Sequence, residues 1–321
     1  MSIVCVLGAT GAQGGSVCNA LKQNPNFKVR AITRNATTAS AKRLSDEGFE
    51  VVAADTDDEG SLIKAFDNAS AIFALTNYDW ETAVKTGRDA AGEQERQQSI
   101  NIAKAAAKIP TLKHYVLSSL PPAGLASKGQ LKVPHFDYKQ EAYRWIVINL
   151  PELAAKTTEL WLGYYASNLG AHPMTKLLPI PMSGSYVWLQ PSKPDALLPI
   201  AGDLSRNAGV VVEGILEAGE KAFGKVAVVV TDYVKMTDLV KIWGEVTGKN
   251  GIFVEVTDDA MQQLWGNLGA EFGSQLRWSE HYPSWHDLVP SDKLLSLGEL
   301  GVENKVSNFR QGLEAIKGTL A

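Results

Sequence analysis

Short apolar runs alternate with segments of helical periodicity along the first half of the chain. The apolar runs, rich in β-branched residues, are 3–7, 28–33, 49–55, 71–76 and 114–119. Helical patterns lie between them, at 14–23, 38–47, 60–67 and 93–108. Strands that alternate with helices form βαβ units, and nearly continuous apolar runs are typical of strands covered on both faces. The pattern predicts an α/β fold with a doubly wound parallel sheet.

The pattern changes in the second half. A helical segment at 134–150 and a sixth apolar run at 159–165 continue the alternation, but from about His172 prolines and glycines crowd the stretch 173–202. The remainder predicts the following elements: a helix at 206–218, strands at 226–230 and 252–256 with a helix between them, and a tryptophan-rich tail of helix and loop.

These changes suggest two unequal parts. We expect a first domain over residues 1–165 and a smaller mixed α/β lobe over 166–321, interleaved with the first. With 321 residues, of which 45% are hydrophobic, the chain can bury a core of that size. No apolar run approaches the roughly 18 residues of a membrane span. Cys5 and Cys18 fall inside regular elements, which favours reduced core thiols and a cytoplasmic protein.

The first predicted strand leads into the glycine turn GATGAQG, residues 8–14. Gly8 permits a tight turn, Gly11 lets backbone N–H groups approach a pyrophosphate, and Gly14 lets the helix pack closely on the strand. Thr10 and Gln13 belong to the same turn. The spacing is GxxGxxG, and its position between strand and helix predicts a Rossmann-type dinucleotide site. The alternative is a tight turn that needs glycine without any ligand.

The residue at the end of the second predicted strand indicates which dinucleotide the site binds. Where an NAD site usually carries an acidic residue, this chain has Arg34, and a guanidinium suits a 2′-phosphate. Asp55, at the end of the third strand, is placed to accept from an adenine amino group. These residues predict NADP(H), with Lys42 as a second cation. The alternatives are a solvated arginine and a turn or cap aspartate.

The chain resembles the NmrA-like proteins, within the atypical short-chain dehydrogenase/reductase superfamily. The resemblance rests on the segments GATGAQGG, AITRN, YVLSSL, VPHFDYKQEAY and ELWLGYYASNL. It implies a Rossmann core, a smaller C-terminal lobe, and a cleft between them over the nicotinamide. Known members are fungal nitrogen regulators, NADPH sensors and reductases, so the resemblance implies the cofactor more firmly than the activity.

The superfamily's catalytic pair is a tyrosine with a lysine four residues later. Lys139 takes the lysine position, where the resemblance implies contact with the nicotinamide ribose, but His135 stands where the tyrosine would be. His135 is either a proton donor or a residue that packs the helix start after Pro134. Ser118 and Ser119 end the fifth strand, where the superfamily places a catalytic serine; we assign that role to Ser119.

The resemblance places further residues near the cofactor. Thr76 and Asn77 follow the fourth strand and should pass near its ribose, and Tyr165 and Asn168 follow the sixth and should border the nicotinamide. All four are also ordinary polar residues at strand ends. Aromatic residues of the second half are candidates for the wall of a substrate pocket: Trp188, Trp265, Trp278, Tyr282 and Trp285.

The sequence and the resemblance together suggest two alternative functions. The favoured one is an NADPH-dependent reductase of a small apolar or aromatic carbonyl, imine or enone, bound in the interlobe cleft. The alternative is an NADP(H)-sensing regulator, active in the nucleus or cytoplasm, that binds a partner protein. The net charge of −4 argues against direct nucleic-acid binding, and we assign no metal because the histidines lack partners at ligand spacing. We expect a monomer or homodimer.

Overall fold

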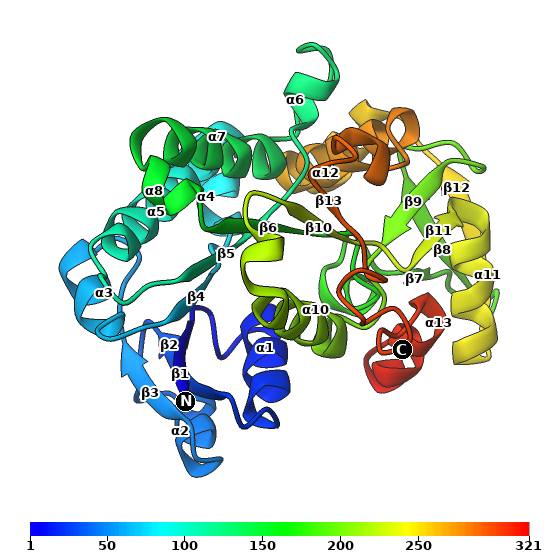
Figure 1. Ribbon diagram of the computed structural model, residues 1–321. Helices are drawn as coiled ribbons and strands as arrows, with labels where there is room; N and C mark the ends of the chain where they lie inside the picture. Colours follow the sequence, from blue (N-terminus) through cyan, green and yellow to red (C-terminus); the bar gives the residue numbers. More distant parts are fainter. Residues whose placement is uncertain (321) are drawn as a thin grey trace.

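An eight-stranded sheet organises the molecule (Figure 1). The structure is a computed structural model, and it describes residues 1–320. All its neighbouring strands pair in parallel, in the order β13-β10-β6-β5-β4-β1-β2-β3. The strands are β1 (Ser2–Val6), β2 (Phe27–Thr33), β3 (Glu50–Ala53), β4 (Ala71–Ala74), β5 (His114–Ser119), β6 (Thr157–Leu162), β10 (Val226–Val229) and β13 (Leu294–Leu295). The predicted fold class is confirmed.

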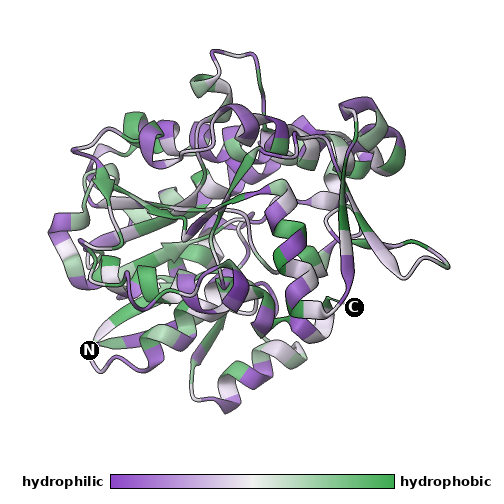
Figure 2. Ribbon diagram, turned by 90° about the vertical axis from the view of Figure 1, so that its right-hand side faces the viewer, coloured by the Kyte–Doolittle hydropathy of each residue, from purple (hydrophilic) through white to green (hydrophobic). Residues whose placement is uncertain are grey.

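Helices cover both faces of this sheet. One face packs against α1 (Ala12–Lys22) and α10 (Leu204–Ala218), with α2 (Ala39–Asp46) beside them. The helices and short turns of the opposite side are α3 (Glu59–Ala65), α4 (Trp80–Lys85), α5 (Arg88–Ala107), α6 (Ala123–Ala126), α7 (Pro134–Asn149) and α8 (Pro151–Ala154). Hydrophobic and hydrophilic segments alternate along the helices in Figure 2, as expected where one face of each is buried.

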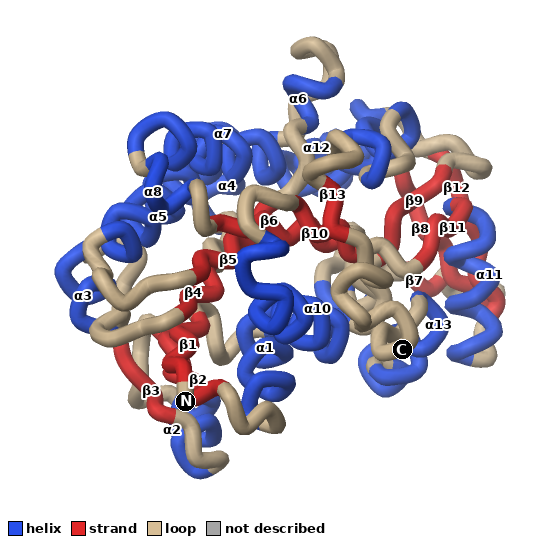
Figure 3. The backbone as a smooth tube through the Cα atoms, viewed as in Figure 1, coloured by secondary structure: helices blue, strands red, loops and turns tan. Residues whose placement is uncertain are grey.

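Strand β1 lies between β2 and β4, so the strand order reverses beside it (Figure 3). Its residue Val6 is opposite Ala31 of β2 and Phe73 of β4. In a doubly wound sheet the loops on either side of such a reversal diverge and leave a crevice at the carboxyl ends of the strands. The glycine turn after β1 opens into this crevice.

Two small sheets and three principal helices lie outside the main sheet, and we call this group of elements the second lobe. Its strands are β7 (Leu178–Pro179), β8 (Ser185–Gln190), β9 (Leu197–Ile200), β11 (Asp232–Lys235) and β12 (Asn250–Glu255). Its helices are the short α9 (Asn168–Ala171), then α11 (Met236–Thr247), α12 (Asp258–His281) and α13 (Phe309–Ala315). The proline- and glycine-rich stretch 173–202 had shown no strand pattern, yet it forms β7, β8 and β9.

Two strands from the second half extend the main sheet. The predicted strand 226–230 pairs as β10 with β6, and β13 continues beyond it. Cys5 and Cys18 are both buried. Among residues 1–320, no helix combines the length and apolar character needed to cross a bilayer.

The crossing of α1 and α10 depends on a glycine. The backbone N–H of Gly209 donates to Ser16 Oγ at 2.9 Å, and a Cβ added at Gly209 would lie 2.1 Å from the Ser16 carbonyl oxygen. No side chain fits without separating the helices.

We therefore expect Gly209→Ala to lower the free energy of unfolding by about 2 kcal/mol, because overpacking a tight contact typically costs 1–3 kcal/mol. Urea denaturation measures the effect. Gly15→Ala is the matched control, since its Cβ would lie 3.4 Å from the Ala9 carbonyl oxygen, an ordinary contact. Equal stability of the two variants would contradict this packing argument.

Candidate active site

A cavity of about 860 Å³ lies at the carboxyl ends of the strands, and we call it the interlobe cavity. Its lining comes from the segments that follow β1, β2, β3, β4, β5 and β6, together with α5, α7 and α12. The predicted site residues at its surface are Gly8, Thr10, Gly11, Gln13, Arg34, Asp55, Thr76, Asn77, Ser118, Ser119, His135, Lys139, Tyr165 and Asn168. Gly14 does not belong to the cavity lining.

The glycine turn has the geometry that its sequence predicted. Gly8 has φ of +61°, in the left-handed region that glycine tolerates, and its carbonyl accepts from the Gly11 N–H at 2.8 Å. A Cβ at Gly14 would lie 2.3 Å from the Gly8 carbonyl oxygen, so Gly14 supports the turn from behind. No side chain caps the start of α1 at Gly11. The N–H groups of its first turn are therefore available to an anion.

Gln13 connects the turn to two neighbouring strands. Its side-chain oxygen accepts from Ser118 Oγ at 2.8 Å, and its amide nitrogen donates to Tyr165 Oη at 2.8 Å. Burial raises the pKa of Tyr165 to about 12, opposed by the hydrogen bond from Gln13. The phenol is thus neutral at physiological pH. Gln13, Ser118 and Tyr165 together form a hydrogen-bonded group at the surface of the interlobe cavity.

Lys139 is held by Glu95 of α5 and by Thr76, which follows β4. Its Nζ lies 2.6 Å from Glu95 Oε1 and 3.0 Å from Thr76 Oγ1, and the Thr76 hydroxyl donates to the same Glu95 oxygen at 3.0 Å. The Glu95 side chain is 1% exposed. The carboxylate compensates the ammonium charge and fixes its position. Nothing in the sequence distinguishes Glu95, because one acidic residue on a helix is usually a surface residue.

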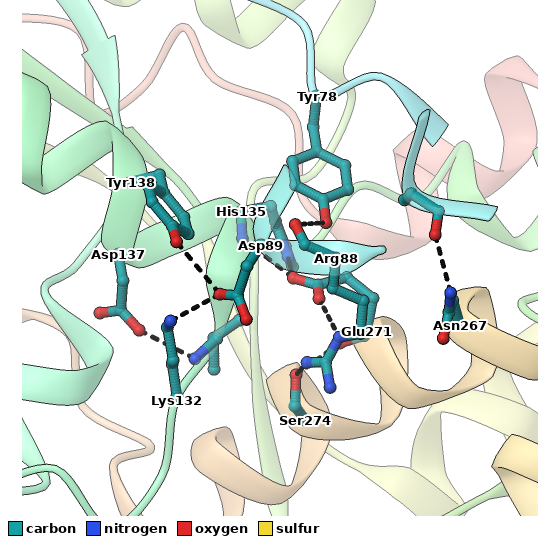
Figure 4. A network of polar contacts seen from close by, with 12 residues as sticks. Tyr78, Arg88, Asp89, Lys132, His135, Asp137, Tyr138, Asn267, Glu271 and Ser274 are labelled. Atoms are coloured by element: carbon teal, nitrogen blue, oxygen red, sulfur yellow. Dashed lines mark hydrogen bonds and ion pairs between the residues drawn. The ribbon is translucent and has the colours of Figure 1, made fainter. Parts of the chain in front are cut away.

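His135 is held by a residue of the second lobe, as Figure 4 shows. Its Nδ1 lies 2.5 Å from Glu271 Oε1, and its backbone N–H donates to the same oxygen at 2.9 Å. The other carboxylate oxygen accepts from Arg88 Nε at 2.5 Å. Glu271 lies on α12, more than 130 residues beyond His135. Nothing near it in the sequence signalled this role.

Ser119 points into a second polar network behind the cavity. It is 2% exposed, and its Oγ accepts from Gln140 Nε2 at 3.0 Å. The same amide donates to Glu159 Oε2 at 2.6 Å. Burial raises the pKa of Glu159 to about 7, although hydrogen bonds from Gln140, Trp161 and Ser119 oppose the shift.

Arg34 and Asp55 lie at the end of the cavity nearest β2 and β3. Arg34 is exposed, and within residues 1–320 no ion pair engages it. Asp55 is also exposed, and its Oδ1 accepts from the Asp57 N–H at 3.0 Å, which is the turn contact considered as its alternative. Lys42 lies outside the cavity lining.

The prediction of which aromatic residues line the pocket was wrong. Trp188 is fully buried in the core of the second lobe, and Trp278 and Trp285 are buried in a cluster with Phe136. Tyr282 packs against that cluster and Trp265 lies outside the cavity lining. Aromatic residues are core residues more often than pocket walls, and their number in the sequence does not separate the two.

Another aromatic group lines the cavity, and we call it the aromatic recess: Tyr78, Trp80, His172 and Phe272. Trp80 stacks on Phe272 with ring centroids 4.9 Å apart, and Tyr78 meets Trp80 edge-on at 4.9 Å. The Tyr78 ring also lies edge-on to His135, 5.9 Å between centroids. The recess therefore adjoins the candidate proton donor.

The parallel fold and its glycine turn define a Rossmann-type α/β protein, and comparisons with known proteins identify its family. The model of the NmrA-like family matches residues 1–296. The chain therefore belongs to the NmrA-like family, as the resemblance predicted.

Curated relatives share much of the chain's length. FrzB of Cladobotryum sp is 31% identical over 262 residues, covering 77% of this chain and 74% of that protein. The cpsB protein of Aspergillus campestris is 29% identical over 280 residues, covering 84% and 78%. Both are described as NmrA-like family domain-containing oxidoreductases.

Solved structures share the fold at low identity. The negative transcriptional regulator Nmra in complex with NADP has a TM-score of 0.72 and 18% identity, covering 99% of this chain and 95% of its own. The NADPH-dependent quinone oxidoreductase QOR2 of Escherichia coli, complexed with NADPH, has a TM-score of 0.70 and 18% identity, with 98% and 99% covered.

The network behind Ser119 gives a pH-dependent stability. The pKa of a glutamate is ordinarily 4.5, and that of folded Glu159 is about 7. Between these two pH values, folded Glu159 retains a proton that the unfolded chain has released. Raising the pH through this window therefore lowers the free energy of unfolding, by about 3 kcal/mol for a shift of this size. We expect Glu159→Gln to reduce that loss, measured by urea denaturation at about pH 5 and about pH 7.5. The exposed Glu152→Gln is the control; an unchanged pH dependence in Glu159→Gln would refute the assignment.

Proposed function

We propose that this protein is an NADPH-dependent reductase of a small, planar aromatic or apolar carbonyl, imine or enone. The observation that carries the proposal is the pairing of His135 and Lys139. They lie one helical turn apart on α7, both line the interlobe cavity, and each is fixed by a buried carboxylate. The curated oxidoreductase relatives support the same class of reaction.

The residues present fit NADP(H). The turn from Gly8 to Gly11 and the uncapped start of α1 suit the pyrophosphate, and the free guanidinium of Arg34 suits the 2′-phosphate. Asp55 suits the adenine amino group and Lys139 the ribose of the nicotinamide. When bound, NADPH supplies the hydride, and the protein must supply the position and the proton.

His135 is the proton donor in this proposal. A protonated imidazole gives up its Nε2 proton as the substrate's reacting carbon is reduced: the N–H bond breaks and an O–H or N–H bond forms on the substrate. The ring is left neutral and takes a new proton from solvent. Lys139 holds the ribose side of the site, and its charge is compensated by Glu95 at 2.6 Å. His135 thus takes the proton-donating role that the tyrosine has in the usual tyrosine–lysine pair.

The aromatic recess supports the substrate class. Its rings stand beside His135, so a flat apolar group packed against Trp80 or His172 lies close to the donor. Both of these side chains are only partly buried. Such surfaces favour planar, weakly hydrated substrates over polyols or phosphate esters.

Arg34→Ala tests the cofactor. We expect its Kd for NADPH to rise at least about tenfold, with little change for NADH, because only NADPH carries the 2′-phosphate. Fluorescence titration of purified protein measures both constants. Arg43→Ala, an exposed arginine on α2 outside the cavity lining, is the control. Equal affinity of the wild type for the two cofactors would contradict the assignment to NADP(H).

His135→Asn tests the chemistry. We expect kcat to fall about 100-fold while the Kd for NADPH stays within about twofold, because a positioned acid contributes about that much to rate. His281→Asn, an exposed histidine outside the cavity lining, is the control. If the wild type binds NADPH but a panel of aromatic imines, enones and quinones leaves it unoxidised, the reductase proposal fails and the NADP(H)-sensing alternative replaces it.

A further inference from the structure

Glu271 is a buried carboxylate with an unusually complete set of donors. Its side chain is 0% exposed. Oε1 accepts from the backbone N–H of His135 and lies 2.5 Å from the ring Nδ1 of the same residue, and Oε2 accepts from Arg88 Nε. Arg88 is itself fixed, because its Nη2 donates to Ser274 Oγ at 2.8 Å and its carbonyl accepts from Tyr78 Oη at 2.7 Å. Figure 4 shows these contacts between α5, α7 and α12.

The carboxylate is ionised in this environment. Burial alone would raise the pKa of Glu271, but the hydrogen bond and charge of His135 and the Arg88 guanidinium lower it below its ordinary value. A buried ion pair is seldom justified by stability alone, since an apolar replacement often serves as well. Glu271 also belongs to the second lobe, whereas His135 belongs to the α7 segment beside Lys139. The contact therefore joins the two parts of the chain at the candidate proton donor.

An ionised carboxylate can only accept hydrogen bonds, so the ring nitrogen that faces it must carry a proton. That nitrogen is Nδ1, at 2.5 Å from Glu271 Oε1. The neutral ring therefore has its proton on Nδ1, and Nε2 is the nitrogen left for the cavity that His135 lines. When Nε2 is also protonated, the positive ring lies against a negative oxygen. A carboxylate that orients a histidine in this way sets its tautomer and stabilises its charged form.

We propose that Glu271 is the positioning residue for His135: it fixes the Nδ1–H tautomer, directs Nε2 into the interlobe cavity, and compensates the imidazolium charge before proton transfer. The catalytic role of His135 rests on the proposed reductase function, whereas the tautomer does not. Arg88 keeps the carboxylate ionised from the opposite side. The orientation of the proton donor on α7 therefore depends on a contact from α12.

The tautomer is tested first, on the full chain without any substrate. Ring-nitrogen NMR of protein labelled at its 5 histidines, with His135→Asn used to assign the signal, reports which nitrogen of the neutral ring is protonated. We expect Nδ1–H for His135 in the wild type and a mixture of tautomers in Glu271→Gln. An Nε2–H tautomer in the wild type would overturn the proposal, and this outcome needs no soluble variant of Glu271.

The role in turnover is tested by a double-mutant cycle. We expect Glu271→Gln to lower kcat about 10- to 100-fold with the Kd for NADPH within about twofold, and to have no further effect on kcat in the His135→Asn background. A merely structural glutamate would lower kcat by the same factor in both backgrounds, and that result would overturn the proposal. A wild-type kcat in Glu271→Gln would overturn it as well.

Glu280→Gln is the matched control. This glutamate also lies on α12, is 8% exposed, and pairs with Lys193 and Arg277 away from the cavity lining. We expect its kcat to stay within about twofold of the wild type. If the wild type shows no turnover, the proposed function fails, but the tautomer measurement still decides whether Glu271 positions His135.

Discussion

The reversal of strand order beside β1 is the constraint on which the rest of the structure depends. Because every strand of the main sheet is parallel, the carboxyl ends of β1 to β6 meet along one edge, and the loops diverge where β2 and β4 flank β1. The close approach of Gly14 to the Gly8 carbonyl keeps α1 against this edge. Residues separated by most of the chain therefore line one cavity.

Two buried carboxylates turn that cavity into a candidate catalytic site. Glu95 of α5 fixes Lys139, and Glu271 of α12 fixes His135. Both side chains project from one face of α7, four residues apart. The same helix thus presents a group suited to the cofactor and a group suited to the substrate, and each has its own anionic support.

The sequence was informative where function depends on local pattern. The alternation of apolar runs predicted the main sheet, the glycine spacing predicted the turn, and the spacing of His135 and Lys139 predicted that they share a helix face. Glu95 and Glu271 escaped notice because their partners lie 44 and 136 residues away along the chain, and nothing local distinguishes them from surface glutamates. Strands β7 to β9 were missed because prolines and glycines concealed their short apolar pattern, and the tryptophans of the core were mistaken for a pocket wall.

The transfer of deuterium from labelled NADPH to product tests the central claim most directly. The protein is mixed with NADPH that carries deuterium at the transferable position and with a panel of planar aromatic imines, enones and quinones, and the products are analysed by mass spectrometry. Our account predicts a product that carries one deuterium from the cofactor, formed at a rate that depends on His135. Bound NADPH that keeps its label with every compound of the panel would contradict it.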